Sequence, residues 1–208
     1  MFLSATFILL TLTLFSSVSA HAKTTSNRER VIAEVNRLGG KLEFEETLAG
    51  RPIVKIDLHG TQVTDADLTV LDDTKKDLKQ LRYLDLRLTK IGDEGVGKLK
   101  NLSSLQTLNL FRTGLGDQGL AHLKKLKNLE TLLIGGTRVS DAGLIYLRPF
   151  KKLRKLSLFQ TEVSNGGIAQ LRLLPSLEVL LIGGSKITPA GAEELQRALP
   201  RVRFSENT

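Results

Sequence analysis

The sequence has no cysteine and only three histidines, His21, His59 and His122. A chain without cysteine has neither a disulfide framework nor a cysteine to which a lipid could be attached. No nucleophile elbow, metal-binding helix motif or phosphate-binding loop occurs in it. We therefore expect no enzyme activity, no catalytic residue, no metal and no cofactor. A weak metal or acid–base trio remains conceivable only at His59, which shares a strand face with Asp57 and could approach Asp85.

The first residues lack charge. Residues 1–20 have no charged side chain, and Phe2 to Phe15 is almost wholly apolar or hydroxylated. This run has the length of a signal-peptide core and is too short to span a bilayer comfortably. Small residues at Val18-Ser19-Ala20 and Ala20-His21-Ala22 offer cleavage sites. We predict a signal peptide over residues 1–22 and a protein that is secreted or lies in the periplasm or cell envelope; an uncleaved anchor is the alternative.

Negative charge is in deficit, with 30 Lys and Arg against 22 Asp and Glu, a formal net charge of +8. Such an excess favours contact with polyanions. Nucleic acid is not expected as a partner, because no recognised nucleic-acid-binding motif is present and an exported protein rarely meets it. Anionic lipid headgroups or polymers of the cell envelope would be the better candidates.

What the chain has is a repeat, Leu-x-Leu-x-x-Thr followed by Asp-x-Gly-Leu-x-x-Leu. Its Thr/Ser positions are spaced by 24 residues, except that Thr61 precedes Thr89 by 28, so the first unit has a four-residue insertion near residues 72–75. Because one such unit cannot bury its own apolar face, the stack is the folding unit of a solenoid. The units are Ile56–Leu71, Leu84–Leu99, Leu108–Leu123, Leu132–Leu147, Leu156–Leu171 and Leu180–Leu195.

Each unit predicts a strand, a turn and a two-turn helix in a parallel, right-handed coil. In the third unit, alternation places Leu108 and Leu110 inward and the residues between and after them outward. We expect the hydroxyls of the Thr/Ser column to satisfy backbone groups of neighbouring coils. We also expect the glycine column, Gly95, Gly119, Gly143, Gly167 and Gly191, to mark places where adjacent backbones approach too closely for a side chain.

The ends of the stack are predicted to be protected. Residues 23–52 are interpreted as a cap made of a helix and a hairpin, and residues 53–198 as the six repeats. Residues 199–208 are interpreted as a C-terminal cap strand and tail, in which Pro200 to Phe204 forms a strand with arginines at alternate positions.

The phrase Thr-x-Val-Thr/Ser-Asp-x-Gly-Leu-x-x-Leu resembles the leucine-rich repeat family. More narrowly, it is similar to the ribonuclease-inhibitor-like, F-box-associated subtype, in a cysteine-free version common in exported bacterial proteins. The resemblance covers Ile53 to Leu195. It implies an α/β fold, a horseshoe-shaped solenoid with a parallel concave sheet and short convex helices, and it says little about function. Departures occur where Gly92 and Gly116 replace the Ser/Thr cap and Asp67 replaces the column glycine.

The outward strand positions predict an apolar strip on the concave face. Repeats three and five carry Leu-Phe-Arg/Gln-Thr where repeats four and six carry Ile-Gly-Gly-Thr/Ser, which indicates duplication of a 48-residue pair. We interpret the strip as a site for a protein partner on a monomer; the alternative is that the phenylalanines fold over the glycines and shield backbone. The predicted contact residues are Tyr83, Asp85, Arg87, Asn109, Phe111, Arg112, Leu133, Lys155, Phe159 and Leu181.

A basic rim is the second candidate site. Lysines and arginines recur between helix end and strand start, whereas Asp65, Asp93, Asp117 and Asp141 gather at the other edge. Helix dipoles favour this distribution without any ligand. The alternative is a structural or polyanion-binding envelope component, whose site would be Lys124, Lys125, Lys127, Lys151, Lys152 and Arg154.

Overall fold

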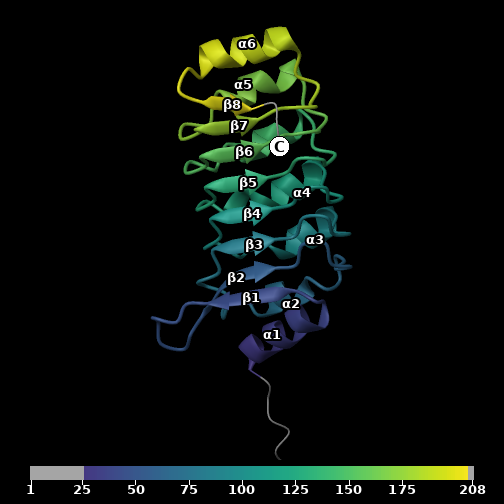
Figure 1. Cartoon of the computed structure of the whole chain (residues 1–208), viewed down its shortest axis with the longest axis vertical. Helices are drawn as coiled ribbons and strands as arrows, with labels where there is room; N and C mark the ends of the chain where they lie inside the picture. The colour runs from purple at the N-terminus through teal and green to yellow at the C-terminus, as the bar shows by residue number, and fades with distance from the viewer. Residues whose placement is uncertain (1–25, 206–208) are drawn as a thin grey trace, which may run out of the picture.

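The computed structural model describes residues 26–205, which form one elongated stack of coils (Figure 1). The predicted signal peptide lies outside the described residues. A single sheet runs the length of the stack, with its eight strands in the order in which they occur in the chain. The strands are β1 (Lys41–Phe44), β2 (Ile53–Asp57), β3 (Tyr83–Asp85), β4 (Thr107–Asn109), β5 (Thr131–Leu133), β6 (Lys155–Ser157), β7 (Val179–Leu181) and β8 (Arg203–Ser205).

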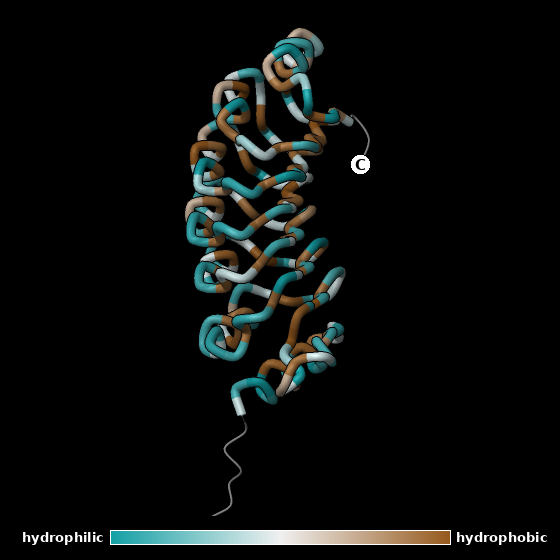
Figure 2. Tube along the Cα trace, turned by 90° about the vertical axis from the view of Figure 1, so that its left-hand side faces the viewer, coloured by the Kyte–Doolittle hydropathy of each residue, from teal (hydrophilic) through white to brown (hydrophobic). Residues whose placement is uncertain are grey.

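Between the two ends of the stack, the helices line the side opposite the sheet (Figure 2). They are less regular than predicted, because the fourth repeat has a 3-10 helix in place of an α-helix and the fifth has one α-helical turn after a 3-10 turn. The α-helices are α1 (Asn27–Arg37), α2 (Thr69–Asp73), α3 (Asp93–Lys98), α4 (Asp117–His122), α5 (Ile168–Leu171) and α6 (Pro189–Ala198). The 3-10 helices are η1 (Leu123–Lys125), η2 (Gly143–Leu147) and η3 (Asn165–Gly167).

The strands from β2 to β8 pair in parallel and in register. Leu84 of β3 lies beside Leu108 of β4, which in turn lies beside Leu132 of β5. Ile56 is the partner of Leu84 despite the longer first repeat, so the insertion is absorbed in α2 and the turns that follow it. These observations confirm the predicted α/β solenoid with a parallel sheet and short helices.

The core is one continuous ladder of aliphatic side chains. Leu84 and Leu108 are fully buried, and Phe150 takes the place that Leu126 occupies one coil earlier. Burying a leucine stabilises the fold by about 1.5 to 3 kcal/mol. Because each coil supplies one layer of this ladder, a coil is stable only between its neighbours.

The threonine column acts within a coil, so the prediction that its hydroxyls bridge coils is wrong. Thr89 Oγ1 donates to the carbonyl of Leu86 at 2.6 Å, and Thr113 Oγ1 donates to that of Leu110 at 2.8 Å. The hydroxyl thereby closes the turn in which the chain leaves the strand. The coils are joined beside it by backbone bonds instead, such as that from Leu88 N to the carbonyl of Phe111 at 2.9 Å.

An aspartate ladder joins successive helix starts. Asp117 Oδ1 accepts from Ser140 N at 2.8 Å, and its Oδ2 accepts from Ser140 Oγ at 2.6 Å. Asp93 in the same way accepts from Gly116 N at 2.6 Å, which compensates for the missing cap side chain there. Each carboxylate therefore stabilises the start of the next coil with charge-assisted hydrogen bonds. The members of the ladder are Asp65, Asp93, Asp117, Asp141 and Asn165.

This ladder explains the glycine column and corrects its interpretation. A Cβ at Gly143 would lie 2.3 Å from Asp117 Oδ1, and one at Gly191 would lie 2.1 Å from Asn165 Oδ1. The space is occupied by a side chain of the preceding coil and not by its backbone.

Different structures cover the two ends of the stack. At one end α1 begins with a capping box between Ser26 and Glu29, and β1 pairs antiparallel with β2, with a bulge between Glu43 and Phe44. At the other end β8 pairs in parallel with β7 and begins at Arg203, three residues later than predicted. Among residues 26–205, no helix has the length and apolar character needed to cross a membrane.

Candidate functional site on the concave face

The parallel register brings the predicted strip together. Leu133 lies between Asn109 and Ser157 in the sheet, and Leu181 is the partner of Ser157 on the next strand. The rings of Phe111 and Phe159 lie 6.4 Å apart between centroids, inclined at 34°. These side chains are partly exposed.

Together they line a hollow of about 460 Å³, which we call the concave groove. It gathers eight of the ten predicted contact residues, leaves out Tyr83 and Asp85, and adds Ser157, which was not predicted. Ser157 shares the register column of Leu133 and Leu181, and that column is the signal that could have found it. The groove is lined by Arg87, Asn109, Phe111, Arg112, Leu133, Lys155, Ser157, Phe159 and Leu181.

Phe111 both covers a glycine and lines the groove. A Cβ at Gly135 would lie 3.1 Å from Phe111 Cδ2 and 2.9 Å from the carbonyl oxygen of Phe159. The glycine therefore lets the ring lie against the neighbouring backbone. The two interpretations of the phenylalanines are not exclusive, because Phe111 shields Gly135 and still borders the groove.

The residue after each phenylalanine has a left-handed backbone. Arg112 and Gln160 have φ of 53° and 52°. A side chain in this conformation costs of order 1 kcal/mol. The stem of Arg112 lies over Gly136, where a Cβ would be 2.6 Å from Arg112 Cγ, and its guanidinium lies 5.3 Å from the Phe111 ring centroid. The paired glycine repeat thus makes room for both the phenylalanine and the arginine.

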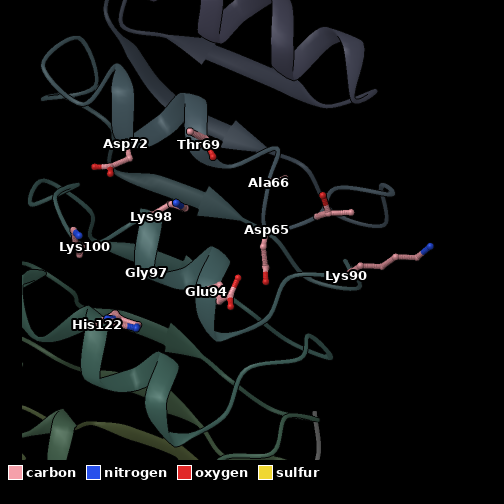
Figure 3. A pocket seen from close by; sticks show the side chains of 11 residues that line it. Asp65, Ala66, Thr69, Asp72, Lys90, Glu94, Gly97, Lys98, Lys100 and His122 are labelled. Carbon is pink, nitrogen blue, oxygen red and sulfur yellow. The ribbon is translucent and has the colours of Figure 1, made fainter.

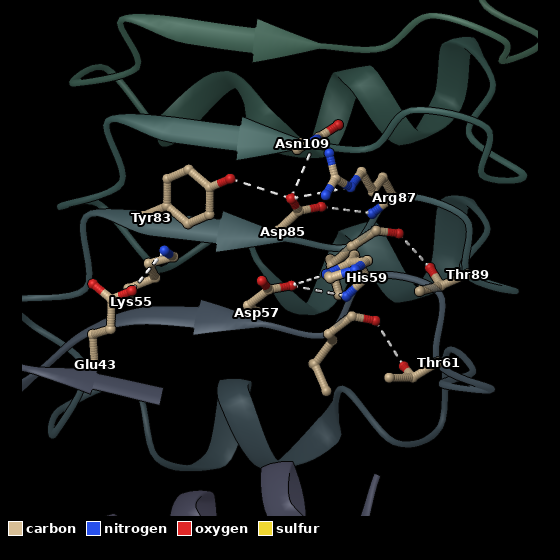
Figure 4. A network of polar contacts seen from close by, with 12 residues as sticks. Glu43, Lys55, Asp57, His59, Thr61, Tyr83, Asp85, Arg87, Thr89 and Asn109 are labelled. Carbon is tan, nitrogen blue, oxygen red and sulfur yellow. Dashed lines mark hydrogen bonds and ion pairs between the residues drawn. The ribbon is translucent and has the colours of Figure 1, made fainter. Parts of the chain in front are cut away.

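In the N-terminal half of the concave face, polar side chains are hydrogen-bonded to one another (Figure 4). Asp85 has a side chain that is only 2% exposed, and it accepts hydrogen bonds from Tyr83 Oη at 3.2 Å and Asn109 Nδ2 at 3.3 Å. Arg87 N donates to the same carboxylate at 3.0 Å. Burial and then the Asp85 carboxylate raise the pKa of Tyr83, which favours its protonated, donating form. Asp85 therefore lies beneath the surface and orients its neighbours, contrary to the expectation of a contact residue, and Asn109 forms part of the groove floor.

His59 and Asp57 form a pair in the same half. His59 Nδ1 lies 2.7 Å from Asp57 Oδ1, and His59 N donates to that oxygen at 3.1 Å. Burial raises the pKa of Asp57, but these contacts together outweigh it and lower the pKa. Within residues 26–205, no three His, Asp or Glu side chains are placed to hold a metal ion, so the structure does not assemble the metal form of the conceivable trio.

Part of the basic rim is already engaged. Arg154 binds Glu178 through two hydrogen bonds of 2.8 and 2.9 Å, which raise the pKa of Arg154 and lower that of Glu178. Lys152 Nζ donates to Asn128 Oδ1 at 2.8 Å. The other four predicted polyanion residues, Lys124, Lys125, Lys127 and Lys151, are exposed and make no ion pair with any described residue.

A second hollow of about 700 Å³ lies on the helix side, around α2, α3 and α4 (Figure 3). It was not predicted, although the insertion in the first repeat marks its place. Its walls carry both signs of charge. Asp72 binds Lys75 and Asn101, and Asp65 accepts from Gly92 N, whereas the Glu94 carboxylate makes no ion pair with any described residue. Its lining has no large apolar side chain, in contrast to that of the concave groove.

Residues 79–100 and 101–124 match the family model described as Leucine Rich repeat. The match supports leucine-rich repeats in these two segments, and the solenoid described above repeats their pattern along the sheet. No curated protein matches the chain. The narrower ribonuclease-inhibitor-like subtype stays a prediction.

Solved structures share the fold. An internalin from Listeria monocytogenes aligns with a TM-score of 0.52 at 17% identity, over 76% of this chain and 51% of that one. A TDR receptor aligns with a TM-score of 0.50 at 22% identity, over 68% of this chain and 24% of the receptor. The chain thus spans about half the length of the internalin and a quarter of the receptor.

Proposed function

We propose that the protein is an exported binding module whose concave groove holds a segment of a protein partner. The observation that carries this proposal is the row formed by Phe111, Leu133, Phe159 and Leu181, four partly exposed apolar side chains on one sheet face. Apolar and aromatic side chains bordered by arginine are typical of residues that dominate binding energy in protein interfaces.

The rest of the concave face supports this choice by contrast. Lys55 is paired with Glu43 at 2.7 Å, and Asp57 and Asp85 have their own partners. A partner would have to replace these internal contacts with equivalent ones, whereas the groove offers apolar surface without that cost. The structural neighbours include a protein named as a receptor, which is compatible with a binding role.

The test measures capture of the partner by variants of the groove leucines. Each leucine is replaced by serine, the residue that the neighbouring strand has at the same register position. Leu133→Ser and Leu181→Ser copy Ser157, and we expect the double variant to lose a specific partner by tenfold or more, roughly 1.4 kcal/mol. Ile145→Ser is the matched control, because Ile145 is an exposed apolar residue on the helix side. Capture from an envelope extract, quantified by mass spectrometry, measures the effect; equal loss in the control or no loss in the double variant would contradict the proposal.

Export and the basic rim belong to the same proposal. Export depends on the predicted signal peptide of residues 1–22, and N-terminal sequencing of the protein recovered from its native source tests it. The alternative function, a structural or polyanion-binding envelope component, is favoured by the exposed rim lysines Lys124, Lys125, Lys127 and Lys151, which make no ion pair with any described residue. Salt-sensitive retention on heparin that disappears when these four become glutamine would support that alternative.

A further inference from the structure

We infer that the occupant of the concave groove is an extended acidic peptide segment with an apolar centre. This inference rests on the proposed function and adds the chemistry of the partner.

The charge of the groove is the first argument. Three of its lining residues are cationic, and none is a carboxylate. Arg112 and Lys155 form no ion pair with any residue among 26–205, whereas Arg82 and Lys55 near the other half of the sheet are paired with Glu45 and Glu43. Only Arg87 has a nearby anion, Asp85, at 3.5 Å. The groove thus has two unpaired positive charges beside its apolar side chains.

The positions of the cations define where a ligand's charges would lie. Lys155 begins β6, whereas Arg112 follows the end of β4. Because β4 and β6 are two strands apart, the two cations lie at diagonally opposite corners of the groove, with Leu133 and Phe111 between them. A ligand that satisfies the groove has an apolar middle and carboxylates on both sides of it.

The size of the groove sets the length of the occupant. Its lining residues come mainly from β4 to β7 and the turns that follow them. Neighbouring strands lie about 4.8 Å apart, so three steps cover about 14 Å, which is the length of four to five extended residues.

Two other occupants fit less well. A second copy would bring the same cationic groove, and each chain carries a formal net charge of +8, so self-association through this face is opposed by repulsion. A flat anionic bilayer would meet the edges of a concave sheet before its floor. Both are included as outcomes of the test.

The experiment measures binding of fluorescent heptapeptides, blocked at both ends, to the mature chain. The acidic probe has a Leu-Phe-Leu centre with two glutamates on each side, and the neutral probe has glutamines in their place. Arg112→Gln copies Gln160, which has the same left-handed backbone, and Lys155→Thr copies its register partner Thr131. Each exchange is expected to weaken binding of the acidic probe by up to about fivefold and to leave the neutral probe unchanged.

The outcomes separate this inference from the proposed function. Stronger binding of the acidic probe, lost with salt and reduced in both variants, supports it. Equal binding of the two probes, abolished by Leu133→Ser with Leu181→Ser, would overturn the acidic preference and leave the apolar groove as a binding site. No binding of either probe, a dimer that forms through the groove, or charge-dependent binding to phosphatidylglycerol vesicles in place of the peptide would each overturn the inference.

Discussion

At the scale of the residue, Gly143 shows how a column of glycines is maintained by a neighbour. Its missing Cβ leaves the space in which Asp117 binds both the backbone and the hydroxyl of Ser140. The Asp117 carboxylate cannot swing aside to admit a methyl group without breaking those two bonds. Glycine here serves a contact between coils and not a turn.

We expect Gly143→Ala to lower the free energy of unfolding by about 1 to 3 kcal/mol, the usual cost of overpacking. In an Asp117→Ala background the same change should cost much less, because only the flexible end of Leu120, whose Cδ1 would lie 3.2 Å from the added Cβ, then has to shift. Urea unfolding of the four proteins in a double-mutant cycle measures the coupling. Additive effects would show that the carboxylate is not what excludes the side chain.

At the scale of the element, the helix start of the first repeat is stabilised differently from those of the later repeats. Among residues 26–205, no earlier coil of the same type supplies an aspartate to its helix start, and the column glycine is replaced by Asp67. Asp67 Oδ2 accepts from Thr64 N at 2.8 Å and Thr64 Oγ1 at 2.6 Å, while its Oδ1 accepts from Arg37 of α1 at 2.7 Å. Asp67 thus caps its own turn and fastens α1 to the first repeat.

This arrangement makes stability depend on pH. The hydroxyl of Thr64 is the main cause of a lowered pKa at Asp67, with Arg37 adding to it. A lowered pKa in the folded state stabilises the fold above the unfolded value, near 3.9 for aspartate, and the contribution is lost as pH falls through the folded pKa. Asp67→Asn should therefore be less stable than the native chain by about 1 to 2 kcal/mol at pH 7, and the difference should shrink below about pH 4.

Unfolding curves between pH 7 and pH 3 measure that difference. Asp73→Asn is the control, since Asp73 is half exposed and its ion pair with Arg30 is 3.8 Å long. A difference at Asp67 that stays constant down to pH 3 would disprove the assigned role.

At the scale of the whole molecule, the 24-residue period was enough to predict the sheet, its parallel register and the alignment of Phe111 with Phe159. Period and alternation determine which residues share a column, and the register follows when each coil has the same length. They do not determine what a polar side chain binds. Asp117 at a helix start has an adequate local explanation in the helix dipole, so its bond to the next coil could not be foreseen. Asp85 is buried because Tyr83 and Asn109 close over it, which requires coordinates to see.

The pairing of repeats predicts which deletions the fold tolerates. Removing residues 112–159 joins Phe111 directly to Gln160 and takes out one complete 48-residue pair of repeats. The aspartate ladder and the ladder of buried leucines should therefore continue across the junction in the same register. We expect a folded but less stable protein, with a lower midpoint of thermal unfolding and only one phenylalanine in its groove. Removing residues 112–147, one and a half repeats, is the control and should not fold. Circular dichroism during heating distinguishes the two, and equal behaviour would show that the stack does not need its coils in phase.

The alternation of Phe-Arg and Gly-Gly coils therefore has an evolutionary consequence. Recombination between paired units would lengthen or shorten the recognition surface in steps of two strands. Each step would add or remove one phenylalanine at the groove, and the ladder of buried leucines would remain continuous. Homologues of this chain could thus acquire longer or shorter ligands by changing the number of units, without redesigning any single coil.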